Sequence, residues 1–285
     1  MLRCQTHPVF VLIFLALCAA LWPFQAWALP KESRVPGGVA LVPLGRVLPD
    51  APAPRAWLGE QPVLVAPDQG SWLAVVGLAL DLPPGSHALR VEDAGNDAPK
   101  ILNFDVRAKA YPEQHIKLKS SSKVNLSPAD EARAVREIAT IQKLKRHWSN
   151  VRVTQTDFIL PASGRLSSRF GLRRFFNDQE RAPHSGLDLA VPRGTPIHAA
   201  ASGIVLAADD YFFNGQSVFI DHGNGLISLY CHLDQIDVQV GDEIRQGESL
   251  GLSGMTGRAS GPHLHWSVIL NGAMVNPELF VAGEK

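Results

Sequence analysis

The sequence predicts a mainly β protein: a small β sandwich-like domain at the N-terminal side, a linking helix, and a C-terminal antiparallel β domain. Three observations predict this fold class. Short apolar runs separated by Pro- and Gly-rich turns fill residues 35–107, helix signals bracket one stretch near residue 130, and Gly-punctuated β-branched runs fill the chain after residue 150. With 285 residues, 46% hydrophobic and 19% charged, the chain is long and apolar enough to build two domains.

Residues 1–28 have the pattern of a secretory signal peptide. Arg3 is followed by an apolar run over residues 9–22, and small residues flank Trp27 at Ala26 and Ala28. We therefore expect cleavage after Ala28 and export of the remaining chain. An uncleaved membrane anchor is the alternative, although the apolar run is short for a membrane span.

Charge and cysteine content exclude several classes of protein. Lys+Arg and Asp+Glu both number 27, so net charge gives no reason to expect a nucleic-acid partner. Cys4 and Cys18 lie in the expected signal peptide, which leaves Cys231 alone in the exported chain. An intramolecular disulfide and a cysteine-rich metal site are therefore excluded.

Residues 35–107 predict the β sandwich-like domain, which we call the accessory domain. Runs such as "QPVLVAP" and "SWLAVVGLAL" alternate with turn signals such as "PDQG" and "LPPGS". The segment contains one histidine, His87, and no cluster of chemically active side chains. It is expected to serve in packing or docking.

Residues 108–150 form a linker and a helix. "HIKLK" is compatible with one more strand. Ser127 is a suitable N-cap, Pro128 suits the first helical position, and acidic residues follow, so a helix is expected to run to about Trp148. Its apolar stripe consists of Ala134, Ile138, Ile141 and Leu144. We expect this helix to pack between the two domains.

Residues 151–285 carry the histidines that point to chemistry. His263 and His265 alternate, so on a strand both would point to one face of the sheet. His184 and Asp188 lie about 13 Å apart on a straight strand, and a bend at Gly186 would be needed to bring them together. Two imidazoles and one carboxylate leave a coordination position open, as in catalytic zinc sites. A turn histidine beside a solvated aspartate is the alternative for the first pair.

The motifs "GRLSSRFGLR", "HSGLDLA", "YCHL" and "GPHLHW", in this order, resemble the lysostaphin/LytM-type zinc metallopeptidases, which cleave peptide cross-links of peptidoglycan. The resemblance covers residues 164–280. The preceding accessory domain and helix resemble the corresponding region of Gram-negative members of that family. The resemblance implies a zinc metallopeptidase domain at residues 151–285 and a location in the periplasm, with secretion or membrane anchoring as alternatives.

Transferred residue by residue, the resemblance implies one zinc ion per chain, held by His184, Asp188 and His265. It implies catalytic roles for His263 and His232, without indicating which is the general base. The expected partners are the peptide stems of peptidoglycan, in addition to a regulatory protein or an autoinhibitory accessory domain that covers the cleft. Cleavage between D-Ala and meso-diaminopimelate is expected from the Gram-negative resemblance, and a glycine bridge is the Gram-positive alternative.

Two alternative functions remain open from the sequence. Relatives that have lost zinc ligands activate other wall hydrolases, but all five candidate residues are present here. A secreted bacteriolytic enzyme would keep the same chemistry on another cell's wall. His198 and His222 are expected to be structural, and Arg173 and Arg174 either line the cleft or lie in a solvated loop.

Overall fold

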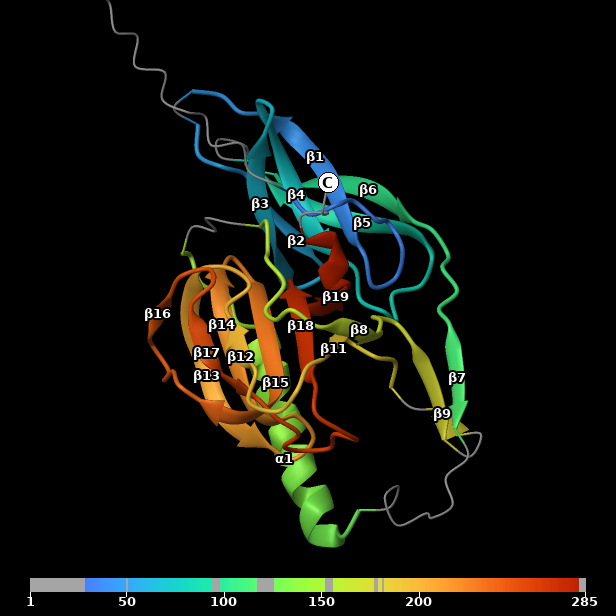
Figure 1. The fold of residues 1–285 in the computed structure, drawn as a ribbon. Helices are drawn as coiled ribbons and strands as arrows, with labels where there is room; N and C mark the ends of the chain where they lie inside the picture. The colour runs from blue at the N-terminus through green and yellow to red at the C-terminus, as the bar shows by residue number, and fades with distance from the viewer. Residues whose placement is uncertain are drawn as a thin grey trace, which may run out of the picture.

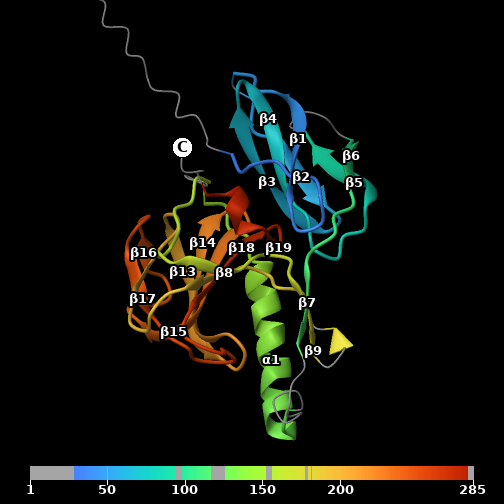
Figure 2. The same cartoon turned by 45° about the vertical axis from the view of Figure 1, so that its right-hand side comes forward.

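The computed structural model describes residues 29–49, 51–93, 98–116, 126–151, 156–176, 179–180 and 182–281. The expected signal peptide lies outside the described residues. Within these ranges the protein is mainly β, and no helix has the length and apolar character needed to cross a membrane. Figures 1 and 2 show the accessory domain above the C-terminal domain, with helix α1 extending away below.

The accessory domain is one curled, antiparallel six-stranded sheet with the strand order β1-β4-β3-β2-β5-β6. Side chains from the first and last of these strands, such as Val42 and Phe104, belong to one apolar cluster, so the sheet curls around its own core. This confirms the predicted small β domain. Its strands are β1 (Val39–Arg46), β2 (Arg55–Leu58), β3 (Gln61–Asp68), β4 (Ser71–Gly77), β5 (Gly85–Glu92) and β6 (Lys100–Val106).

One half of this sheet is buried on both faces. Val76 of β4 points into the core of the accessory domain, whereas its neighbour Val75 belongs to the cluster that contains the core of the C-terminal domain. Strands buried on both faces are apolar throughout, which explains the unbroken run "WLAVVGLAL". The apolar cluster of the C-terminal domain therefore includes residues of the accessory sheet.

The linker contributes one strand and one helix. Strand β7 (Glu113–Ile116) pairs in parallel with β9 (Arg173–Phe176) of the C-terminal domain, and β10 (Gln179–Glu180) completes this three-stranded sheet. Helix α1 (Pro128–Lys145) begins as predicted, because the Ser127 side chain accepts a hydrogen bond from the backbone N–H of Asp130.

The apolar stripe predicted on α1 was partly wrong. Ala134 is buried, and Ile141 and Leu144 pack against a cluster of the C-terminal domain, but Ile138 is 46% exposed. The helix contacts the domain along a narrow face, and Ile138 lies outside that face. Much of α1 is consequently in contact with solvent.

The C-terminal domain is a ten-stranded antiparallel sheet with the central order β16-β13-β14-β15-β18-β11-β8, to which β12, β17 and β19 are attached. Its strands are β8 (Arg165–Ser168), β11 (Leu187–Ala190), β12 (Pro196–His198), β13 (Gly203–Tyr211), β14 (Gly215–Gly223), β15 (Leu226–Ile236), β16 (Glu243–Ile244), β17 (Ser249–Ser253), β18 (Leu264–Leu270) and β19 (Ala273–Val275), followed by a short 3-10 helix at Pro277–Leu279. The neighbouring strands β15, β18 and β11 bring the candidate site residues together.

Candidate metal centre

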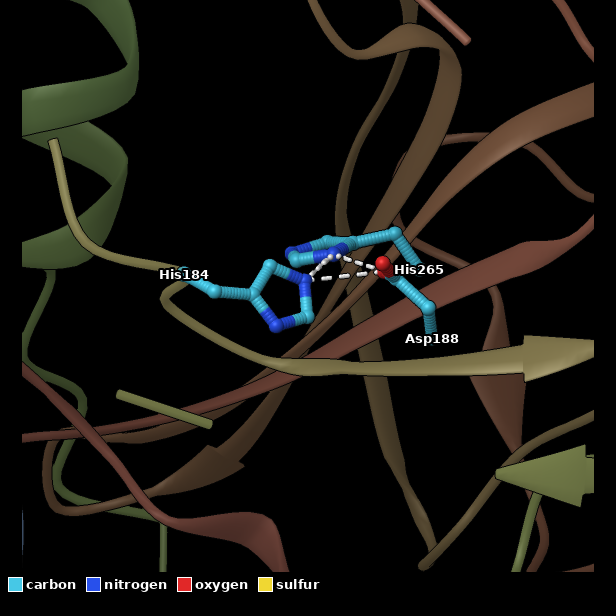
Figure 3. A group of neighbouring side chains, drawn as sticks. All are labelled: His184, Asp188 and His265. Atoms are coloured by element: carbon cyan, nitrogen blue, oxygen red, sulfur yellow. Dashed lines mark hydrogen bonds and ion pairs between the residues drawn. The ribbon is translucent and has the colours of Figure 1, made fainter. Parts of the chain in front are cut away.

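His184, Asp188 and His265 converge on one point. Asp188 Oδ1 lies 2.9 Å from His184 Nε2 and 2.8 Å from His265 Nδ1, and the two nitrogens lie 3.0 Å apart. Figure 3 shows the two imidazole rings meeting at the carboxylate oxygen. The pairing of β11 with β18 sets Asp188 directly opposite His265, and His184 reaches the same point from the segment before β11.

Gly186 is needed for close packing between these ligands. A Cβ atom at this position would lie 2.4 Å from the backbone oxygen of Trp266 and 2.8 Å from the His265 ring. The sequence suggested a bend at Gly186, and the structure adds a steric reason for glycine there. Any larger residue would push β18, and with it His265, away from β11.

The hydrogen bonds of the outward-facing ring nitrogens determine whether the inward-facing nitrogens of His184 and His265 can bind a cation. Nδ1 of His184 lies 2.9 Å from the backbone oxygen of Arg169, and Nε2 of His265 lies 2.9 Å from Oγ of Ser267. In the tautomers that donate along these two contacts, both inward nitrogens present lone pairs beside a carboxylate oxygen. Three electron-pair donors this close together fit a divalent cation, and imidazole and carboxylate are ligands that such cations use.

Burial and hydrogen bonding set the charge state of the cluster. Burial alone raises the pKa of Asp188. Hydrogen bonds that His184 and His265 donate when their inward nitrogens carry a proton outweigh burial and hold that pKa well below its usual range. Burial lowers the pKa of His265, which favours its neutral form. An ionised carboxylate and a neutral imidazole are the forms that bind a metal.

Two further imidazoles flank the cluster. Nδ1 of His263 lies 2.8 Å from the backbone oxygen of Gly261, and Nδ1 of His232 lies 2.9 Å from that of Thr256. When each Nδ1–H donates to its carbonyl, each Nε2 is left as an acceptor. The two ring centroids lie 4.8 Å apart, and Nε2 of His263 lies 3.8 Å from Asp188 Oδ1. Burial, followed by the nearby His265, lowers the pKa of His232 to about 4.

A β-bulge directs His232 toward this site. Strand β15 pairs with β18 up to Cys231 and with β17 from Leu233 onward, and His232 between them has φ +64°. A left-handed conformation at a residue other than glycine is uncommon and marks local strain. The sequence predicted His232 at the site through the "YCHL" resemblance, whereas nothing in its local pattern indicated the bulge.

The contacts of the residues that surround His184, Asp188 and His265 required the structure. Nη2 of Arg174 donates to Oγ of Ser168 at 2.9 Å and lies 3.6 Å from Asp188 Oδ2. The neighbouring Arg173 instead forms ion pairs with Glu113 and Glu180. The sequence offered the two arginines as equivalent, but they point to different partners because adjacent strand residues face opposite ways.

His198 and His222 lie outside the site. Nδ1 of His198 contacts the backbone oxygen of Gly247 at 3.0 Å. His222 is buried, with Nδ1 2.7 Å from the Ser202 backbone oxygen and Nε2 2.8 Å from Oγ of Ser228. These contacts come from other segments rather than from the local turn, and they are consistent with the structural role expected for both histidines.

Comparison with protein families gives two adjacent matches. Residues 182–277 match the model of peptidase family M23, and residues 32–109 match the model of the peptidase family M23 N-terminal domain. A crystal structure from Pseudomonas aeruginosa, of a protein assigned to peptidase M23, superimposes with a TM-score of 0.74 at 42% identity. The superposition covers 88% of this chain and 96% of that one.

Two named relatives are similar to the C-terminal domain. The peptidoglycan DD-endopeptidase ShyA of Vibrio cholerae is 42% identical over 113 residues, which are 39% of this chain and 26% of ShyA. The DD-carboxypeptidase/endopeptidase Mpg of Neisseria meningitidis is 41% identical over 113 residues, which are 40% of this chain and 26% of Mpg. The match thus spans only 26% of the length of each relative.

The family assignment rests on the whole chain rather than on one motif. Both family models match in consecutive segments, and the crystal structure from Pseudomonas aeruginosa is similar over nearly its full length. The chain belongs to peptidase family M23.

Proposed function

We propose that the protein is a zinc-dependent endopeptidase that hydrolyses peptide cross-links of peptidoglycan during cell-wall remodelling. The observation that carries the proposal is the convergence of His184, Asp188 and His265 beside two histidines whose Nε2 atoms are free to accept a proton. The relatives that are named peptidoglycan DD-endopeptidase or DD-carboxypeptidase/endopeptidase support the substrate class.

Zinc is the metal that suits this ligand set best. Two histidines and one carboxylate are a usual ligand set for catalytic zinc, and three protein ligands leave room for a reactant. One zinc ion per chain would be held by His184 Nε2, Asp188 Oδ1 and His265 Nδ1. Bound there, zinc would polarise the carbonyl of the cleaved bond and make a water molecule more acidic.

His263 and His232 would carry out the proton transfers between the attacking water and the departing amine. Both rings are fixed by a backbone carbonyl at Nδ1, so in the neutral form each Nε2 accepts a hydrogen bond. One ring takes the proton of the attacking water and later passes it to the departing amine, while the other orients the water. Arg174 and Ser168 keep the Asp188 and His184 side chains in place during these steps.

The expected bond is the D-Ala to meso-diaminopimelate cross-link, and a glycine bridge is the alternative substrate. The test is digestion of purified peptidoglycan of both types, with the products identified by mass spectrometry. Release of monomers from the diaminopimelate type alone supports the proposal. Release from the glycine-bridged type alone would contradict this choice of bond.

Export to the periplasm is part of the same proposal, because peptidoglycan lies outside the cytoplasm. It rests on the basic start, apolar run and Ala26-Trp27-Ala28 sequence of residues 1–28. N-terminal sequencing of protein recovered from a periplasmic fraction should begin at Leu29. Full-length protein in the membrane fraction would instead indicate an anchor.

The proposed restraint of the enzyme by its own N-terminal half would act through the linker rather than through the accessory sheet. The accessory sheet contacts the Leu270 end of β18, away from His265, whereas β7 lies along β9, which carries Arg174. Strand β7 is therefore the better candidate for limiting access to the cleft. A shortened protein beginning at Leu126 retains α1 but lacks β7 and the accessory domain, so it tests restraint by the whole N-terminal half. Faster hydrolysis by this protein supports restraint, and slower hydrolysis by folded, metal-loaded protein contradicts it.

A further inference from the structure

His232 is held in its strained conformation by two backbone carbonyls. The first belongs to the loop that joins β13 to β14, and the second belongs to the loop that joins β17 to β18. Its backbone N–H donates to the oxygen of Asn214 at 2.8 Å, and its Nδ1 lies 2.9 Å from the oxygen of Thr256. A left-handed conformation at a residue other than glycine is unfavourable and persists only where the surroundings impose it. The direction of the His232 ring therefore depends on where these two loops lie.

The two loops are locked to each other. The side chain of Thr256 accepts from the backbone N–H of Gln216 at 3.0 Å and donates to the Leu233 oxygen at 2.7 Å. The backbone N–H of Arg258 donates to the oxygen of Phe213 at 3.0 Å. A Cβ atom at Gly257 would lie 2.3 Å from the Gly215 nitrogen, so the backbones are in direct contact. Displacement of one loop would displace the other.

Helix α1 holds the first of these loops from outside the sheet. Oε2 of Glu137 accepts from the backbone N–H of Phe212 at 2.5 Å, and its Oε1 accepts from Nε of Arg133 at 2.6 Å. Nη2 of Arg133 donates to the backbone oxygen of Asp210 at 3.1 Å. A carboxylate and a guanidinium on one helix thus bind two backbone groups at the end of β13, two to four residues before Asn214.

The position of Glu137 distinguishes it from the rest of the helix. The Glu137 side chain is 20% exposed, whereas Val135 and Ile138 beside it are 62% and 46% exposed. Arg133 faces the same side and forms an ion pair with the Glu137 carboxylate, which orients the carboxylate for its hydrogen bond with the Phe212 N–H. The helix therefore contacts the loop through a partly buried, charge-assisted pair.

We propose that Glu137 is a positioning residue for His232, acting through the loop that joins β13 to β14. The inference rests on the proposed function in taking His232 to be catalytic. Glu137 fixes the N–H of Phe212, the loop fixes the carbonyl of Asn214, and that carbonyl fixes the backbone of His232. Helix α1 is then a working part of the active site as well as a connection between domains.

The alternative is that Glu137 only fastens the helix to the domain. Loss of the side chain would then lower stability without changing the geometry of His232. The two roles predict different turnover numbers at constant metal content. They also predict different rates of hydrogen exchange at the His232 backbone amide. The second measurement requires no substrate, so it also distinguishes failure of this inference from failure of the proposed function.

The experiment compares Glu137→Ala with Glu131→Ala in the full chain. Both variants remove one glutamate from α1, but Glu131 is exposed in the first turn, whereas the hydrogen bond with the Phe212 N–H is made by Glu137. For Glu137→Ala we expect a kcat about tenfold to a hundredfold lower, since small misplacement of a catalytic group has effects of this order. The KM and the metal content should stay close to those of the wild type. The His232 amide should exchange faster, as measured by NMR or mass spectrometry.

Two conservative variants keep the proposal testable if Glu137→Ala fails to fold. Glu137→Gln retains an acceptor oxygen and should recover much of the kcat, whereas Glu137→Asp keeps the charge but is one methylene too short and should resemble Glu137→Ala. Glu131→Ala should match the wild type in both measurements. Wild-type kcat and unchanged amide exchange in folded Glu137→Ala or Glu137→Asp would overturn the proposal. Faster amide exchange in a protein that is inactive even as wild type would support the positioning and contradict the proposed function.

Discussion

The side-chain amide of Asn271 binds both backbone groups of Gly77. Its Oδ1 accepts from the Gly77 N–H at 2.6 Å and its Nδ2 donates to the Gly77 oxygen at 3.1 Å, so one residue after β18 joins the C-terminal domain to the end of β4. Both contacts are buried. Asn271→Ala should therefore lower the free energy of unfolding by about 1–3 kcal/mol, measured by urea denaturation, because two backbone groups lose their partner.

Backbone strain at this position needs a separate control. Asn271 has φ +42°, a conformation that alanine tolerates poorly and glycine tolerates well. Asn271→Gly removes the side-chain amide and its hydrogen bonds, and glycine adopts the positive φ without strain. If Asn271→Gly were as stable as the wild type, the hydrogen bonds to Gly77 would contribute nothing measurable.

Substitution of two site histidines should separate metal binding from catalysis. His184→Ala should lose the metal and the activity together, because Nε2 of His184 is part of the converging set. His263→Ala should retain close to one equivalent of metal and lose activity about a hundredfold to ten-thousandfold, as is usual for a general acid–base group. Elemental analysis and hydrolysis assays on the same preparations give both quantities. Loss of metal from His263→Ala would make that residue a ligand.

Ser267 should tune metal affinity without binding the metal. It is fully buried on β18, with its hydroxyl 2.9 Å from Nε2 of His265. Ser267→Ala removes the partner that holds the ligand ring in place, and such changes typically weaken metal binding about tenfold to a hundredfold. Competition with a chelator measures the affinity, and Ser217→Ala, also buried but with its hydroxyl on backbone oxygens, is the control. Equal affinities for the two variants would show that Ser267 does not orient His265.

His222 should make the stability of the fold depend on pH. Burial lowers its pKa to about 4 in the folded protein, from about 6.5 in the unfolded chain. Between these values the unfolded chain binds one more proton, so stability is fully present above about pH 6.5 and falls as the pH decreases toward 4. The contribution of this residue is about 1.4 kcal/mol per pH unit within that window.

The comparison that isolates His222 uses metal-free protein. Wild type and His222→Gln are unfolded with urea at several pH values, so the titration of the other histidines is common to both. The slope of stability against pH should be smaller in His222→Gln by about one proton. Identical slopes would mean that His222 is protonated equally in the folded and unfolded states.

Local patterns in the sequence predicted the elements, but their long-range pairing required the structure. Ser127 and Pro128 located the start of α1 correctly, because capping depends on neighbouring residues alone. The convergence of His184, Asp188 and His265 followed from a resemblance, and the structure supplied its cause in the register of β11 against β18. Register between distant strands depends on packing over the whole sheet, which spacing along the chain does not encode.

The pairing of the linker strand and the β-bulge at His232 could not be predicted from the sequence. The sequence allowed another strand at "HIKLK", of which His115 and Ile116 belong to β7 and the rest lies outside the described residues. The parallel pairing of β7 with β9 depends on a domain that follows later in the chain. The positive φ of His232 lies where the register of β15 against β14 shifts and where the pairing of β15 passes from β18 to β17. Ile138 was assigned to the buried face because helical spacing does not show how narrow a contact the neighbouring domain makes.

Hydrolysis of a purified cross-linked muropeptide dimer tests whether the protein is a zinc-dependent peptidoglycan endopeptidase. The dimer is incubated in ¹⁸O-labelled water with wild-type protein, with chelator-treated protein before and after zinc is restored, and with His263→Ala. We expect wild-type and zinc-restored protein to give two monomers, with one ¹⁸O in the new carboxylate. The chelated protein should leave the dimer intact, and His263→Ala should cleave it about a hundredfold to ten-thousandfold more slowly. Cleavage by metal-free protein, or an intact dimer with folded wild-type protein that carries one zinc ion, would contradict the proposed function.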